Sequence, residues 1–240
     1  MDTIVKAFIA SHSDFTTGEF TDVLVENYPD IGRSTVFYYL KSLCDTGAVT
    51  RVSRGRFEVS GNKKYCYELS DTAKSISALI SKSYPLVCFQ IWEFNQMNEF
   101  VNHLLSHNTI IVEVEDVLDE TVFNMLFKLY PHVLLNPTDN EYYKYHGDET
   151  IVVRKLISEA PPSYGALKQA SLEKILVDLF GRGISGSIIS KSEYKAIYED
   201  SFEKYSINQA KMFRYARRRG IGNKIKSFIQ EETDIVLEAG

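Results

Sequence analysis

Several features that mark other protein classes are scarce or missing in this chain of 240 residues. Its three cysteines, Cys44, Cys66 and Cys88, form no Cys-x-x-Cys pair, which excludes a disulfide framework and a zinc site built on paired cysteines. We interpret them as buried, reduced thiols of a cytoplasmic protein. No run approaches the roughly 18 apolar residues of a membrane span. The start, Met1-Asp2-Thr3, also lacks the basic and apolar regions of a secretion signal.

Motifs of nucleotide binding and of common catalytic sites are also missing. There is no P-loop or Gly-x-Ser-x-Gly sequence, and the Gly-x-Gly-x-x-Gly spacing at residues 181–186 does not follow a predicted strand. The nearest segment, Gly181-Arg182-Gly183-Ile184-Ser185-Gly186, follows a predicted helix and lacks the Gly-Lys-Ser ending, so we interpret it as a loop between helices. His103 and His107 are four residues apart on a predicted helix without the glutamate of a His-Glu-x-x-His site. We therefore expect no cofactor, no metal and no catalytic residue.

One enzymatic alternative stays open at this point. Glu113, Glu115 and Asp116 close a predicted strand, and such carboxylates hold Mg²⁺ in nucleases with a restriction-endonuclease-like fold. The expected acid-x-Lys triplet is incomplete, because Val153-Arg154-Lys155 has no acid at its first position. We favour a solvated acidic rim, which also includes Asp119 and Glu120, over a DNA-targeted nuclease.

What the chain does contain is enough apolar sequence for two domains and a very uneven distribution of charge. The hydrophobic content is 44% and the net charge is −5. Residues 86–160 hold twelve acids. Residues 33–64 hold seven cations and only two acids, and residues 211–226 hold seven cations and no acid. The total charge argues against a protein that coats nucleic acid over its whole surface, but it leaves room for local basic surfaces.

The first seventy residues show three helical patterns. Apolar residues at helical spacing predict helices at 3–10 and 19–27, the second one capped near Thr16 and ended by Tyr28-Pro29-Asp30-Ile31-Gly32. Ser34 or Thr35 caps a third helix that runs to about Asp45.

The third helix has the composition of a helix that reads DNA. Val36, Leu40 and Leu43 share the face that packs on the first two helices. The opposite face is polar, aromatic and basic, as suits the major groove. Its members are Ser34, Tyr38, Lys41, Ser42 and Asp45, with Thr35 at its edge and Arg33 at the start of the helix. Of these we assign Arg33, Ser34, Thr35, Tyr38, Lys41 and Ser42 to DNA.

Short strands follow this helix. Residues 48–52 and 57–60 flank Arg54-Gly55-Arg56, and alternation at Tyr65, Tyr67 and Leu69 predicts a third strand. This order is typical of a winged helix-turn-helix, whose hairpin arginines contact phosphate or the minor groove. Two turns with basic residues qualify as the wing, 54–56 and 61–64. The cations that we assign to DNA in this hairpin region are Arg51, Arg54, Arg56, Lys63 and Lys64.

The segment STVFYYLKSLCDTGAVTRVSRG, followed by KKYCYEL, resembles the winged helix of ferric-uptake-type and other small bacterial repressors. The histidine and cysteine clusters that bind metal in those repressors have no counterpart here. The resemblance therefore implies the DNA-reading module alone.

The rest of the chain predicts an α/β domain. We expect a linking helix within 71–85, strands at 86–92, 109–114, 133–135, 142–145 and 151–156, and helices at 96–106 and 120–130. After Pro161-Pro162 the pattern is helical, at 172–180, 192–205, 207–219 and 223–231. The expected fold class is α+β: a winged helix-turn-helix at 1–70, then a small α/β sheet domain with a C-terminal helical cluster at 86–240.

Several segments in order, IWEFNQMNEFVNHLL, IIVEVED, VLLNP, LISEAP, SLEKILVDLF and FEKYSINQAKMFRYARRRG, resemble the C-terminal domain of AbiE-type antitoxin-like regulators of phage defence. The resemblance implies a winged helix that binds inverted repeats of duplex DNA in its own promoter. It also implies a second domain that counters a nucleotidyltransferase-like toxin encoded nearby.

A last basic group lies near the C-terminus. Arg214, Arg217 and Arg218 share one side of a predicted helix at i, i+3 and i+4, and Arg219 follows them. We interpret these four arginines as a surface for nucleic acid or an acidic partner.

Overall fold

The computed structural model describes residues 2–45, 48–59, 64–162, 168–181 and 184–237. It is an α+β protein with two small sheets, and its chain divides into two compact units. Unit 1 comprises residues 1–65, 202–208 and 236–240, and unit 2 comprises residues 66–201 and 209–235. None of the helices in the described ranges is long and apolar enough to cross a membrane.

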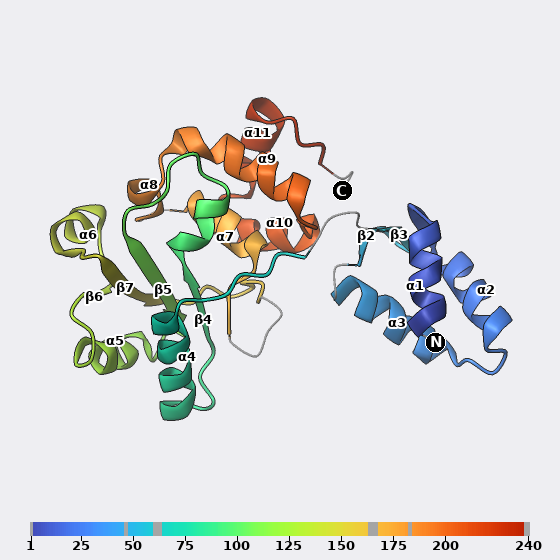
Figure 1. Ribbon diagram of the computed structural model, residues 1–240, viewed down its shortest axis with the longest axis horizontal. Helices are drawn as coiled ribbons and strands as arrows, with labels where there is room; N and C mark the ends of the chain where they lie inside the picture. The colour runs from blue at the N-terminus through green and yellow to red at the C-terminus, as the bar shows by residue number, and fades with distance from the viewer. Residues whose placement is uncertain (1, 46–47, 60–63, 163–167, 182–183, 238–240) are drawn as a thin grey trace. The chain divides into compact units, whose positions relative to one another are not determined.

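Unit 1 combines helices (Figure 1) with a three-stranded antiparallel sheet in the order β1-β3-β2. Its elements are α1 (Asp2–Ser11), β1 (Asp14–Thr16), α2 (Thr17–Asn27), α3 (Arg33–Asp45), β2 (Val49–Ser53) and β3 (Arg56–Val59). The three expected helices and the hairpin strands are confirmed. The strand expected at Tyr65, Tyr67 and Leu69 is wrong, because this segment has no strand and the third strand is β1.

Aromatic rings hold unit 1 together. The Phe15 ring stacks on Phe57 across paired strands at 5.4 Å and also meets Phe8 from α1 at 5.1 Å. Val36 and Leu40 of α3 are buried in the same cluster. Thr16 caps α2 through a capping box with Glu19, as expected from the sequence. The start of α3 differs from the expected one, because the helix begins at Arg33, ahead of the proposed cap residues.

Unit 2 is built on a four-stranded mixed sheet in the order β4-β5-β7-β6. Strands β5, β7 and β6 are parallel, while β4 runs antiparallel to β5. The strands are β4 (Phe89–Glu93), β5 (Asn108–Val114), β6 (Val133–Leu135) and β7 (Glu149–Lys155). The expected strands at 109–114, 133–135 and 151–156 are confirmed, and the strand expected at 86–92 forms over its second half.

Two predictions in this region are wrong. Residues 142–145 lie in a helix, α6 (Asp139–Tyr145), because a capping box of Thr138 and Glu141 starts a helix there. Residues 96–106 form no α-helix, and only the 3-10 helix η1 (Phe94–Glu99) is present. His103 and His107 therefore do not share a helix face.

One face of this sheet packs on α4 (Asp71–Ser83) and α5 (Asp119–Phe127) (Figure 1). Ala73, Ile76 and Ile80 of α4 are fully buried in a cluster with the strands. We expected a linking helix here. The structure instead gives α4 to the core of unit 2, because its apolar stripe covers β4 and β5.

The opposite face of the sheet is covered by C-terminal helices, among which α7 and α10 lie nearest to it (Figure 1). The described helices of this region are α7 (Leu172–Leu179), α8 (Ser185–Ile188), the 3-10 helix η2 (Lys191–Glu193), α9 (Tyr194–Lys204), α10 (Gln209–Arg218) and α11 (Gly222–Glu232). The helical cluster expected after Pro161-Pro162 is thus confirmed. The end of α9 and its connection to α10, residues 202–208, belong to unit 1.

The cysteines also correct an expectation. All three are free thiols, but Cys66 and Cys88 are exposed and Cys44 is half-buried. Cys66 lies in an irregular segment and Cys88 directly precedes β4, so neither side chain is enclosed by packed elements.

The position of α4 makes a testable prediction. An Ile76→Ala variant should lose about 2–5 kcal/mol of the free energy of unfolding, because it removes a fully buried side chain and leaves a cavity. Urea unfolding followed by circular dichroism measures this loss. The matched control is Ser75→Ala, an exposed position on the same helix, which should change little. Equal stability of both variants would show that α4 is a linker.

Candidate nucleic-acid interface and a buried ion cluster

The outer face of α3 is a largely exposed polar and aromatic surface of unit 1. Tyr38 is 69% exposed, and Arg33, Ser34 and Lys41 are exposed with it. Thr35 and Ser42 lie half-buried at its edges. Because Val36 and Leu40 pack inward, this face is held outward by the core.

The cations of this face and of the hairpin between β2 and β3 are only weakly paired within the described part of unit 1. Among the described residues, Arg33, Lys41 and Arg54 form no ion pair, whereas Arg56 approaches Asp14 at 3.7 Å. An exposed pair of that length contributes little to stability. Guanidinium and ammonium groups therefore stay available for an external anion.

The hairpin between β2 and β3 fixes two more arginines. Gly55 has φ +78, a conformation that favours glycine, and its carbonyl accepts a hydrogen bond from Thr17 N–H at 2.8 Å. This bond fastens the turn to the start of α2, so Arg54 and Arg56 are exposed beside that helix end.

Two of the remaining cations predicted to contact DNA donate hydrogen bonds to backbone carbonyl groups. Arg51 is exposed, and its Nε donates to the Ser53 carbonyl at 3.3 Å. Lys64 is half-buried and donates to the Asp45 carbonyl at 3.0 Å. Lys63 lies outside the described residues, as does most of the second candidate wing, 61–64.

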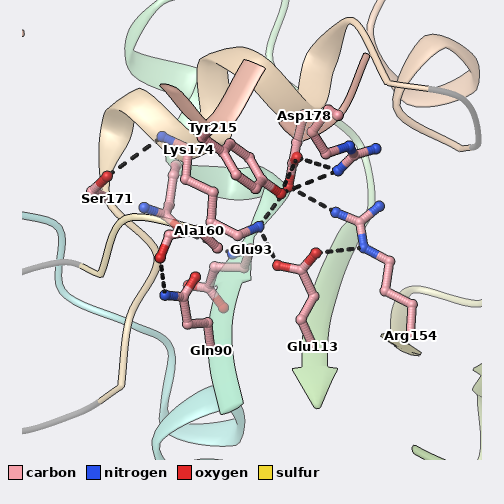
Figure 2. Close-up of polar contacts among 11 residues, drawn as sticks. Gln90, Glu93, Glu113, Arg154, Ala160, Ser171, Lys174, Asp178 and Tyr215 are labelled. Atoms are coloured by element: carbon pink, nitrogen blue, oxygen red, sulfur yellow. Dashed lines mark hydrogen bonds and ion pairs between the residues drawn. The ribbon is translucent and has the colours of Figure 1, made fainter. Parts of the chain in front are cut away.

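Unit 2 contains a charged cluster that the sequence interpretation missed. It lies between the sheet and the helices above it: Glu113 and Arg154 are register partners on β5 and β7, and Lys174 and Asp178 are four residues apart on α7 (Figure 2). Tyr215 of α10 and Arg219 complete it. We call these six residues the ion cluster.

Asp178 is the centre of the ion cluster. Arg154 bridges the two carboxylates, with Nε 3.0 Å from Glu113 and Nη2 2.9 Å from Asp178. The Lys174 ammonium contacts both of the same carboxylates. The other oxygen of Asp178 accepts from the Tyr215 hydroxyl at 3.0 Å and from Arg219 Nη1 at 2.5 Å.

These charges are almost completely removed from water. The side chains of Lys174 and Asp178 are 0% exposed, and Glu113 is 1% exposed. Burial alone raises the pKa of Asp178. The neighbouring cations Lys174, Arg154 and Arg219 lower it by more than burial raises it, so this pKa lies below its ordinary value. The carboxylate is therefore ionised and surrounded by its counter-charges.

Gly181 makes room for one of those counter-charges. A Cβ atom at Gly181 would lie only 2.5 Å from Nη2 of Arg219, which is closer than real Cβ contacts. Gly181, the first glycine of the segment 181–186, thus allows Arg219 to pack against α7. Helix α8 begins within the same segment, at Ser185.

The ion cluster changes the interpretation of the acidic segment after β5. Glu113 is not part of a solvated rim, because it is enclosed by two cations. Asp119 is also buried and accepts from the backbone N–H of Glu120. Asp116 is exposed and pairs with Lys155.

Glu113, Asp116 and Asp119 of the acidic segment have separate partners. Among the residues that the structure describes, no group of three His, Cys, Asp or Glu side chains is placed to hold a metal ion. The only candidate carboxylate on the strand, Glu113, is already neutralised.

Another buried carboxylate explains the segment before α4. Glu93 is 0% exposed and accepts from the Tyr67 hydroxyl, from Ser70 N–H and from the Ser70 hydroxyl at 2.7–2.9 Å. The Asn108 amide donates to it as well, at 3.2 Å. These bonds hold the entry to α4 against the end of β4, so Tyr67 is used as a hydrogen-bond donor and not as a strand residue.

The C-terminal arginines separate into different roles. Arg219 belongs to the ion cluster, which corrects its assignment to a contact surface. Arg214 pairs with Glu159 at 2.9 Å, and Arg218 Nε donates to the Ser158 hydroxyl at 2.6 Å. Arg217 is exposed.

Comparison with known families places most of the chain in a family of unknown function. A model described as a family of unknown function, DUF6577, matches residues 35–235. No curated protein matches the chain. The matched range begins inside α3 and includes the β2–β3 hairpin and all the residues of the ion cluster.

The ion cluster predicts how stability depends on pH. An Asp178→Asn variant should lose about 3–5 kcal/mol of the free energy of unfolding near pH 7, since it leaves buried cations without their counter-charge. The folded pKa of Asp178 lies below the unfolded value of about 3.9. Its contribution is therefore complete above that pH and is lost as the pH falls through the folded pKa.

Urea unfolding at a series of pH values tests this prediction. The difference between the natural protein and Asp178→Asn should shrink below about pH 4. Asp22→Asn, an exposed position on α2, is the control. A difference that stays constant with pH would mean that the charge of Asp178 does not stabilise unit 2.

Proposed function

We propose that this chain, which belongs to the DUF6577 family, is a DNA-binding transcriptional regulator whose unit 1 is a winged helix-turn-helix. One observation carries the proposal: α3 presents an outward face on which Arg33 and Lys41 have no acidic partner among the described residues. A helix with unpaired cations and an exposed tyrosine suits the major groove of a duplex.

The topology of unit 1 supports this assignment. Helix, strand, helix, helix and a two-stranded hairpin follow one another along the chain, and β1 pairs with the hairpin. In a winged helix the second helix of the helix-turn-helix pair reads the groove and the hairpin flanks it. Here α3 takes the first role and the turn at Arg54-Gly55 takes the second.

The roles of individual residues follow from their positions. Ser34 and Thr35 lie in the first turn of α3, where side chains of a recognition helix reach base edges. Tyr38 and Lys41 lie one and two turns further on the same side. Arg54 and Arg56 at the hairpin turn are placed for phosphate or minor-groove contacts.

The overall charge of −5 is compatible with this role. Non-specific affinity for DNA depends on how many phosphates are neutralised locally. A protein that is acidic elsewhere is repelled from DNA except where its basic surface faces the duplex. The acidic region at 86–160 therefore favours binding through a defined surface.

We further propose that the regulator acts as an antitoxin in phage defence, with unit 2 as the part that counters a nucleotidyltransferase-like toxin. This second proposal rests on the resemblance of segments such as SLEKILVDLF and FEKYSINQAKMFRYARRRG to AbiE-type regulators. Both segments contribute to the ion cluster, the first with Lys174 and Asp178 and the second with Tyr215 and Arg219.

The DNA-binding proposal predicts the effect of two substitutions. Lys41→Ala and Arg54→Ala should each weaken binding to duplex DNA from the upstream region of the gene, by about 10-fold or roughly 1.4 kcal/mol. Each should also lower the slope of log affinity against log salt concentration by about 0.9, because one phosphate contact is lost. Fluorescence anisotropy at several salt concentrations measures both quantities.

Lys82→Ala is the matched control, because Lys82 is an exposed lysine on α4 of unit 2. Thermal unfolding of the three variants should be the same as that of the natural protein. Unchanged affinity and unchanged slope in both Lys41→Ala and Arg54→Ala would remove the assignment of this surface to DNA.

The antitoxin proposal predicts a toxin gene beside the gene of this protein. Expression of that nucleotidyltransferase-like protein alone should arrest growth, and co-expression of the present chain should restore it. The Lys41→Ala/Arg54→Ala double variant should still restore growth, because it alters unit 1 only. The antitoxin role fails if no neighbouring product arrests growth or if co-expression gives no rescue.

A further inference from the structure

The helix α10 carries the densest positive charge of unit 2. Residues 211–226 hold seven cations and no acid. Because a helix turns by about 100° per residue, Arg214, Arg217 and Arg218 lie within one outward arc of α10. Met212, Tyr215 and Ala216 are buried on its inner side. We call Arg214, Arg217 and Arg218 the α10 arginine face.

The ion cluster holds this helix in place from beneath. Tyr215 and Arg219, one turn apart at the end of α10, both bond to Asp178 of α7. The inner side of α10 is thus fixed by charged hydrogen bonds in a region that excludes water. The outer arginines therefore project from a rigid support, which lowers the entropy that an incoming ligand must remove.

The α10 arginine face is incompletely neutralised. Arg214 pairs with Glu159, but the two side chains are 59% and 48% exposed, and such surface pairs contribute little. Arg218 has only the Ser158 hydroxyl, a neutral acceptor. Arg217 lies beside the start of α11, where a Cβ at Gly222 would meet its Cγ at 3.2 Å, and no ion pair of Arg217 is present among the described residues.

The surroundings of the face indicate which kind of partner it fits. Residues 209–232 are all described, and none of the exposed large hydrophobic side chains lies among them. Protein interfaces are anchored by aromatic or aliphatic side chains that fill pockets, and this surface has no such anchor. Guanidinium groups bind phosphate oxygens through two parallel hydrogen bonds, so closely spaced arginines fit a chain of phosphates.

We propose that unit 2 binds the phosphate backbone of double-stranded DNA through the α10 arginine face. The choice of duplex DNA as the polyanion rests on the function proposed above, while the surface itself does not depend on α3. The contact is non-specific, because it involves phosphates and no base edges. It adds affinity and salt dependence to binding that α3 directs to a sequence.

Two pairs of substitutions in the full-length protein test this inference. The first is Arg217→Ala/Arg218→Ala on the α10 arginine face, and the second is Arg33→Ala/Lys41→Ala on α3. Affinity for the upstream duplex and for an unrelated duplex is measured from 50 to about 300 mM salt, where phosphate contacts dominate. Lys191→Ala/Lys195→Ala is the control, since both lysines are exposed near the start of α9.

The α10 pair should weaken binding to both duplexes alike and lower the salt slope by up to about 1.8, or 0.9 for each lost phosphate contact. The charge-preserving pair Arg217→Lys/Arg218→Lys should recover most of the slope. The control pair should match the natural protein.

The inference is overturned if the α10 pair leaves affinity and slope for both duplexes unchanged. It is also overturned if this pair weakens binding to polyglutamate but not to DNA, because the surface would then serve an acidic protein. The α3 pair tests the proposed function separately. If only this pair loses the preference for the upstream duplex, α3 reads the DNA sequence, and the α10 inference is judged by the α10 pair.

Discussion

The desolvated carboxylate of Asp178 is the interaction on which the architecture of unit 2 depends. Two buried carboxylates and three cations lie between the sheet and its helical cover, and Asp178 contacts all three cations. Removing either carboxylate would leave uncompensated positive charge in a dry interior, which costs several kcal/mol. This constraint fixes α7 on β5 and β7, and it fixes α10 on α7.

Unit 1 is held by a different kind of force. Its core is small and aromatic, with Phe8, Phe15, Phe20 and Phe57 in ring contact. Hydrogen bonds at the ends of elements complete it, as in the capping box of Thr16 and the bond from Thr17 to Gly55. The two units therefore separate the tasks that we propose for them. Unit 1 exposes the cations of α3 and of its hairpin, whereas unit 2 buries the ion cluster and exposes arginines on α10.

Elements with a clear hydrophobic periodicity were predicted from the sequence, whereas elements that depend on tertiary contacts were missed. The apolar face of α3, the hairpin at Arg54-Gly55 and strand β5 followed from local patterns alone. The helix at 139–145 was missed because its aromatic run resembles a strand, although the Thr138 and Glu141 capping pair was visible. Strand β1 is only three residues long and forms by pairing with β3, which no local pattern reveals.

The ion cluster could not be predicted from local sequence patterns either, because tertiary contacts bring its residues together. Glu113 and Arg154 are 41 residues apart and meet only because β5 and β7 are neighbours in register. One signal was present in the sequence: Lys174 and Asp178 stand four apart inside a largely apolar helix, and such charges need buried partners. Arg219 looked like its three basic neighbours, and only the fold separates it from them.

The central claim is that α3 lies against DNA, and photo-crosslinking tests it most directly. A photoreactive phenylalanine analogue at Tyr38, which is 69% exposed on α3, is compared with the same analogue at Tyr143, which is 58% exposed on α6. The account predicts a crosslink to the upstream duplex from position 38 and none from position 143. Crosslinking from position 143 alone, or equal yields from both positions, would contradict it.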